Sequence, residues 1–212
     1  MNRLQRRTGV AVLCLGAALI MVACGSSATN TSGSSGPAGS TATNPSAGPN
    51  PNATESAPPG DIPDNQAFVP YAPKGTGYRL QVPEGWAMTQ PGRATLFTDK
   101  YNSIRIEKLT VAKAPTVASA TSTELPRIKA AAHGFVPGSV TAAPRKAGTA
   151  IKITYRADSV PNPVTGKVIV QAVERYEFWR AGREVVLTLS ASLGSDNVDP
   201  WRKVTDSFAW MA

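Results

Sequence analysis

The sequence predicts an α+β domain over residues 66–212, with a largely antiparallel sheet of about six strands and two helices, preceded by a disordered tether. The first observation is the alternation of apolar and polar residues in several segments, which is the pattern of strands with one buried face. The second is the short connections between neighbouring segments, which favour antiparallel pairs. The third is a stretch before residue 66 that lacks the apolar residues of a core.

Residues 1–23 have the pattern of a signal peptide. Arg3, Arg6 and Arg7 form a basic start, and an apolar stretch from Gly9 to Ala23 follows. This stretch is too short to span a bilayer, which takes about 20 residues. The paired arginines leave twin-arginine export open, but Gly9 interrupts the apolar pair expected after that motif and favours general secretion.

Cys24 follows Ala23 directly at the end of the apolar stretch, in an arrangement that resembles a bacterial lipobox. Cleavage between Ala23 and Cys24 would leave the cysteine first, carrying a diacylglyceryl group, and two acyl chains hold a protein stably on a membrane. The alternative is an ordinary secretory cleavage site in which Cys24 is incidental. The tract of serine, glycine and threonine that follows favours lipidation, so we expect anchoring on the extracytoplasmic face of the cell membrane.

Residues 24–65 predict a lipidated cysteine followed by a flexible linker. The segment consists mainly of serine, glycine, threonine, alanine, proline and asparagine, and it contains no lysine or arginine. Treated as a flexible coil, roughly 40 residues would hold the domain some 35 Å from the membrane. Cys14, the only other cysteine, lies in the predicted signal peptide. The mature domain is therefore expected to hold no disulfide and no cysteine-bound metal.

Six segments are expected to form strands: 78–82, 94–98, 103–111, 151–156, 168–180 and 185–193. The second and third read as a hairpin across a polar turn. In the third, apolar residues change parity from Ile104 and Ile106 to Leu109, so we expect a bulge near Glu107 or Lys108.

Two helices complete the predicted domain. In the C-terminal helix, Asp199 is expected at the N-cap and Pro200 at the first helical position. Its core stripe is expected to be Trp201, Val204, Thr205, Phe208 and Met211. The other helix is expected within 117–133, with its regular part beginning near Thr123 because Pro126 follows. Its buried face is expected to be Leu125, Ile128 and Ala132.

The predicted domain is basic, with 19 lysines and arginines against 11 aspartates and glutamates from Gln66 onward. Near an anionic envelope such a charge could favour lipid head groups, phosphorylated glycans or acidic proteins, or it could simply be a solvated surface. Nucleic acid is not expected as a partner, because the charges are scattered along the sequence and the predicted compartment holds none.

Several runs resemble the PsbP-like superfamily: Gly77 to Trp86, Phe97 to Asp99 with Asn102, Asp199 to Trp201, and Ser207 with Phe208. Together with the lipobox and tether, the chain resembles actinobacterial envelope lipoproteins of LpqN type. The resemblance implies an antiparallel sheet sandwiched by helices and non-catalytic roles in binding or assembly. The matched positions look structural, with Trp86 and Trp201 as core aromatics, so the resemblance transfers no binding residue.

Residues that could carry catalysis are sparse, and we expect no catalytic residue, cofactor or metal. His133 is the only histidine, and its place before Gly134 indicates a helix C-terminus rather than a general base. Glu174 and Glu177 fall on opposite faces of their strand, so they cannot form the facing pair of a glycosidase.

The sequence therefore favours a non-catalytic binding or assembly module for an envelope protein or glycan. The contact surface would be the sheet face or the loop 158–167. The candidate partner contacts are Asn162, Arg175 and Trp179. One alternative is a lipid or glycolipid carrier, which would need an apolar cavity between sheet and helices. Another is an envelope hydrolase that uses Glu174 or Asp158.

Overall fold

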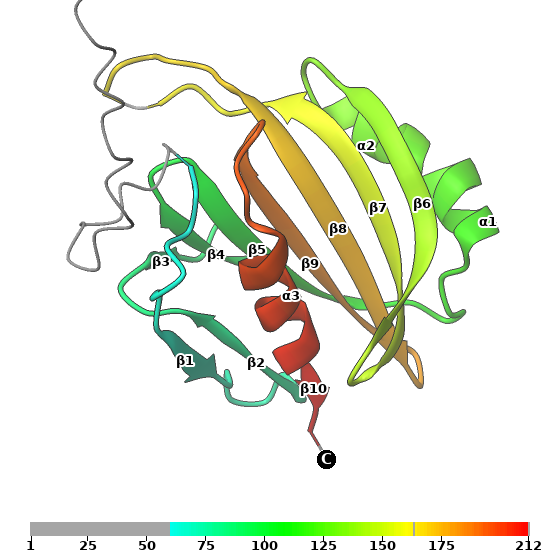
Figure 1. Ribbon diagram of the computed structural model, residues 1–212. Helices are drawn as coiled ribbons and strands as arrows, with labels where there is room; N and C mark the ends of the chain where they lie inside the picture. The colour runs from blue at the N-terminus through cyan, green and yellow to red at the C-terminus, as the bar shows by residue number, and fades with distance from the viewer. Residues whose placement is uncertain (1–59, 163, 212) are drawn as a thin grey trace, which may run out of the picture. The chain divides into compact units, whose positions relative to one another are not determined.

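The computed structural model describes residues 60–162 and 164–211. The predicted signal peptide, the cleavage site at Ala23 and Cys24, and most of the tether lie outside the described residues. The described chain forms a seven-stranded sheet and a three-stranded sheet, in which every paired neighbour is antiparallel (Figure 1). The large sheet has the order β3 (Ala87–Thr89), β4 (Ala94–Asp99), β5 (Asn102–Thr110), β9 (Arg183–Ser192), β8 (Val170–Arg180), β7 (Gly148–Asp158), β6 (Val136–Arg145). The small sheet has the order β1 (Phe68–Tyr71), β2 (Tyr78–Pro83), β10 (Ala209–Trp210).

Helices cover both faces of the large sheet, as the resemblance implied. Helix α3 (Val198–Ser207) lies on one face together with the small sheet (Figure 1). On the opposite face lies a continuous helical segment, residues 117–131, near β6 and β7. It consists of α1 (Val117–Ser119), a π-helical turn η1 (Ala120–Glu124) and α2 (Leu125–Ala131).

The main core fills the space between the large sheet, α3 and the small sheet. Phe208 lies at its centre, stacked on Phe178 at 4.3 Å and on Tyr78 at 6.1 Å between ring centres. Leu187 and Leu189 of β9 are completely buried beneath them. Burying a side chain of this size contributes about 1.5–3 kcal/mol, so this layer holds α3 and the small sheet on the large sheet.

The helical segment forms a smaller core of its own. Ala120 packs with Ile151 and Ile153 of β7, and the half-buried Leu125 and Ile128 complete this cluster. The segment therefore covers the β7 end of its sheet face, whereas β5 and β9 carry Ser103, Thr188 and Ser190 on the uncovered part of that face.

The fold class is confirmed, and all six predicted strands are present. β1, β3, β6 and β10 were not predicted. β6 contains Pro137 and Pro144, which depart from a strand pattern but are tolerated because β6 is an edge strand of the sheet. The bulge predicted near Glu107 or Lys108 is wrong, since β5 pairs with β9 without a register shift. The change of parity instead reflects Leu109 lying exposed at the end of the strand.

The predicted start of α3 needs a correction. The helix begins at Val198 with Asn197 at the N-cap, and Asp199 lies in its first turn. The Asn197 side chain does not cap the helix, because it bonds elsewhere: Nδ2 donates to Gly60 O at 2.9 Å, and Oδ1 accepts from Ile62 N at 2.7 Å. Its amide thus joins α3 to the chain that enters the domain.

The ends of both helices also differ from the prediction. α3 ends at Ser207, because the next residues form β10 against β2, so Met211 lies beyond the helical stripe. α2 begins at Leu125, close to the predicted start, but its C-cap is Ala132. His133 follows the cap and is exposed.

Candidate functional site

The sheet face that the helical segment leaves uncovered is hollowed by a groove of about 500 Å³, which we call the sheet-face groove. Strands β4, β5, β9, β8 and β7 form its floor, and residues 158–162 with Lys167 form part of its rim. Its lining comes from the strand positions that alternate with the main core. Ile104 and Leu189, for example, point into the core, so Ser103 and Ser190 beside them face the groove.

The floor of the groove carries a row of hydroxyl and amide groups, and the apolar Leu96 and Val173 and the charged Arg105 also line it. Ser103 Oγ and Ser190 Oγ share a hydrogen bond of 2.7 Å, and Gln171 Nε2 donates to Ser190 Oγ at 3.3 Å. Thr188 lies two residues before Ser190 on β9 and lines the same groove. Each hydroxyl both donates and accepts, so this row offers a ligand several donors and acceptors on a rigid sheet.

Two tyrosines line the groove. Tyr101 lies in the turn between β4 and β5, with Lys167 Nζ 5.9 Å from its ring centre. Tyr155 of β7 packs against Phe135, with 5.6 Å between ring centres. Burial raises the pKa of Tyr155 above its usual value, so its hydroxyl stays protonated and can donate a hydrogen bond at neutral pH.

The rim of the groove is held by hydrogen bonds. Asn162 Oδ1 accepts from Val164 N at 3.0 Å and from Thr165 N at 2.9 Å, which closes a tight turn. Asp158 N donates to His133 O at 2.9 Å, so the rim is tied to the chain that leaves α2. Gly134 beside it has φ of +60°, and a Cβ there would lie 2.5 Å from Asp158 Oδ2. Glycine at 134 therefore permits the close approach of the two segments.

A charged cluster lies on the same sheet face, beneath the helical segment. Arg175 Nη2 bonds Glu124 Oε1 at 2.7 Å, and Arg175 Nε bonds Glu177 Oε1 at 3.3 Å. Burial is the main cause that raises the pKa of Glu177. Burial, and then the nearby charge of Glu177, raises the pKa of Glu184 to about 7.

The three predicted partner contacts lie in different surroundings. Asn162 lines the sheet-face groove. The side chain of Arg175 is only 13% exposed and is held by its two carboxylate partners. Trp179 is half-buried, and its Nε1 donates to Val111 O at 2.8 Å. The structure therefore does not gather them into one surface, and Cys24 lies outside the described residues.

The carboxylates considered for hydrolysis are also separated. Glu174 accepts from Lys152 Nζ through Oε1 at 3.0 Å and from the Tyr176 hydroxyl through Oε2 at 2.6 Å. As predicted, it lies on the sheet face opposite Glu177. Asp158 lines the sheet-face groove. Within residues 60–162 and 164–211, no three histidine, cysteine, aspartate or glutamate side chains gather as a metal site. No helix in this part of the chain is long and apolar enough to cross a membrane.

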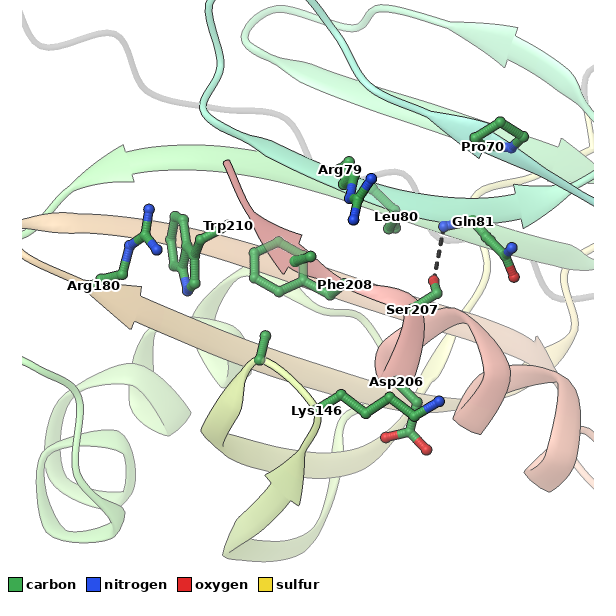
Figure 2. Close-up of a pocket in the computed structure, with 12 residues that line it drawn as sticks. Pro70, Arg79, Leu80, Gln81, Lys146, Arg180, Asp206, Ser207, Phe208 and Trp210 are labelled. Atoms are coloured by element: carbon green, nitrogen blue, oxygen red, sulfur yellow. Dashed lines mark hydrogen bonds between the residues drawn. The ribbon is translucent and has the colours of Figure 1, made fainter. Parts of the chain in front are cut away.

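A second groove, of about 700 Å³, lies where β2, β10 and the end of α3 meet (Figure 2). We call it the basic groove, because Arg79, Lys146 and Arg180 line it together with Trp210. Sequence reasoning noted Arg180 beside Trp179 but did not bring these four residues together, since they lie on separate elements and the cations appear in the sequence as scattered charges. The polar floor of the sheet-face groove could have been recognised, because Thr188 and Ser190 alternate with the apolar residues of β9.

No family model and no curated protein matches this sequence. Among solved structures, the chain is similar to the cyanobacterial PsbP protein CyanoP of Synechocystis sp. PCC 6803, at a TM-score of 0.51 and 16% identity over 68% of this chain and 93% of that chain. The Ran-binding protein Mog1p of Saccharomyces cerevisiae matches at a TM-score of 0.48 and 12% identity, over 68% of this chain and 96% of that chain.

LpqN, described as involved in cell envelope biogenesis of Mycobacterium tuberculosis, matches at a TM-score of 0.41 and 17% identity, over 70% of this chain and 93% of that chain. Identities at this level bear on the fold alone, and of these three matches the one to CyanoP has a TM-score above 0.5. With the antiparallel sheet covered by helices on both faces, that match gives the domain a PsbP-like fold.

Proposed function

We propose that this protein is an extracytoplasmic lipoprotein whose domain is a non-catalytic binding module for an envelope glycan. The observation that carries the proposal is the sheet-face groove, in which a row of hydroxyl and amide groups lies between two tyrosines. Glycans present hydroxyl groups and flat C–H faces. Binding sites for small polar ligands combine a few fixed polar groups with aromatic side chains, and this groove supplies both.

The floor also favours a glycan over an acyl chain. A lipid carrier needs an apolar cavity, whereas the lining of this groove combines apolar side chains such as Leu96 with the hydroxyls of Thr188 and Ser190. Burying such groups against an acyl chain without hydrogen bonds costs about 1–3 kcal/mol each. The lipid carrier is kept as an outcome of the test.

The anchor is proposed from the sequence. Cys24 with the preceding apolar segment supports lipidation, and the linker would give the domain reach into the envelope. Labelling of growing cells with a fatty acid tests this point separately. Wild-type protein is expected to carry label in the membrane fraction and Cys24→Ala to carry none; label on Cys24→Ala would rule out the anchor.

The glycan site is tested with soluble peptidoglycan fragments released by muramidase digestion. We expect them to shift the NMR signals of the groove residues. Thr188→Val keeps the side-chain shape but removes one hydroxyl from the floor, so binding should weaken about tenfold, as expected for a lost hydrogen bond. Thr141→Val, at an exposed position on edge strand β6, is the matched control and should bind as wild type.

Two results would contradict the glycan site. One is equal weakening by Thr188→Val and Thr141→Val, which would mean that the sheet-face groove is not the contact. The other is the absence of binding to any fragment while native mass spectrometry of the purified chain detects a bound lipid, which would favour the carrier.

A further inference from the structure

The basic groove lies outside the proposed glycan site and is built from different elements. Arg79 comes from β2, Lys146 from the turn between β6 and β7, and Arg180 from the end of β8 (Figure 2). All three side chains are exposed, and within the described part of the chain none of them forms an ion pair. The fold thus brings to one groove three cations that have no carboxylate partner among residues 60–162 and 164–211.

The one carboxylate in the groove lining does not offset these cations. Asp206 lies 3.6 Å from Arg145 Nε through Oδ1 and 3.4 Å from Arg202 Nε through Oδ2. Arg145 is itself fixed, because it donates to the Thr205 and Tyr176 hydroxyls at 2.9 Å. Since Asp206 already has two cationic partners, the potential in the groove remains positive.

Trp210 gives the groove a rigid aromatic wall. Its ring packs edge-on against Phe208 at 5.1 Å, and β10 is held by pairing with β2. The guanidinium carbon of Arg180 lies 5.3 Å from the centre of this ring, and Arg180 Nη2 donates to Met211 O at 2.8 Å. Arg180 is therefore oriented before any ligand arrives, which lowers the entropy lost on binding.

We propose that the basic groove binds a ligand that carries a phosphate group, with Arg79, Lys146 and Arg180 as its cationic contacts. A phosphate presents several charged acceptor oxygens, and it suits a set of separated cations better than a single carboxylate does. Arginine can bond two of its oxygens at once through a planar pair of N–H groups. Trp210 lies beside this position and contacts the group that bears the phosphate.

The phosphate can belong to a soluble compound or to a lipid head group, and the experiment separates the two sources. The full chain with Cys24→Ser is titrated with glycerol 3-phosphate while the Trp210 indole N–H signal is followed by NMR. It is also sedimented with vesicles of phosphatidylcholine alone and of equal parts phosphatidylcholine and phosphatidylglycerol. Sedimentation with the neutral vesicles measures what the apolar N-terminal segment contributes.

The test variant is Arg79→Gln/Lys146→Gln, and Arg93→Gln/Lys129→Gln is the control, with the same charge change at exposed positions outside the groove. The groove variant should bind about fivefold more weakly for each cation removed, and the control should bind as wild type. Added salt should weaken binding by wild type.

A response to glycerol 3-phosphate that the groove variant loses supports the proposal with a soluble ligand. Sedimentation selective for phosphatidylglycerol that the groove variant loses supports it with a lipid ligand. Equal losses in the groove variant and the control would show diffuse charge attraction and overturn the site, as would the absence of binding to both probes. None of these outcomes depends on the sheet-face groove.

Discussion

The buried carboxylate of Glu184 should make the stability of this domain depend on pH. Glu184 lies on β9 beside Trp179 of β8, only 7% exposed, and shares its sheet face with Glu177. Burial, and then the charge of Glu177, raises its pKa from 4.5 to about 7. The folded protein therefore holds a proton on Glu184 at pH values where the unfolded chain has released it.

The sign and size of the pH effect on stability follow from the difference between the pKa of Glu184 in the folded protein and its pKa in the unfolded chain. Because the folded state binds the proton more tightly, the stabilisation is fully present below pH 4.5 and is lost as the pH rises to about 7. A difference of about 2.5 pKa units corresponds to about 3 kcal/mol, at about 1.36 kcal/mol for each unit. The pKa of Glu177 is also raised, so Glu177 should add a smaller loss of stability as the pH rises.

The assay is urea-induced unfolding followed by tryptophan fluorescence between pH 4.5 and 8. Glu184→Gln keeps the shape of the side chain and removes its titration, so the variant should gain up to about 3 kcal/mol over wild type as the pH rises. Glu84→Gln removes an exposed carboxylate and should follow the wild-type curve. A difference between Glu184→Gln and wild type that stays constant over this range would refute the reasoning.

Two further substitutions test how the domain is held together, each by its free energy of unfolding. Asn197→Ala removes the buried amide that bonds Gly60 O and Ile62 N, so it should cost about 1–3 kcal/mol, whereas Asn65→Ala at an exposed position should change little. Gly134→Ala should cost more than Gly166→Ala. Both glycines have positive φ, at +60° and +67°, but only a Cβ at 134 would meet the Asp158 carboxylate. Equal costs for the two glycine variants would show that the contact with Asp158 contributes nothing.

The central strands and the two helical regions could be predicted because their signals are local. Alternation in β7 and β9 follows from one strand face packing on the main core, and Pro126 marks the start of α2 in sequence. β6 and β10 could not be predicted in this way. β6 contains prolines, which disfavour a strand, and β10 has only two residues. Both segments are extended because β6 pairs with β7 and β10 pairs with β2.

In the candidate sites, too, some features follow from local sequence signals and others only from tertiary structure. The polar residues beside the core positions of β9 follow from its alternation, so a polar sheet face is implied by the sequence. That this face remains open as a groove depends on how far the helical segment reaches across the sheet.

The basic groove depends on tertiary structure throughout. Arg79, Lys146 and Arg180 are far apart along the chain, and no local pattern relates them. They meet because β10 returns the C-terminus to β2, beside the β6–β7 turn and the end of β8. The sequence alone thus predicts the class of fold, its central strands and a lipid anchor at Cys24. Long-range pairing and packing place the side chains that form the grooves, because local periodicity carries no information about which distant segments meet.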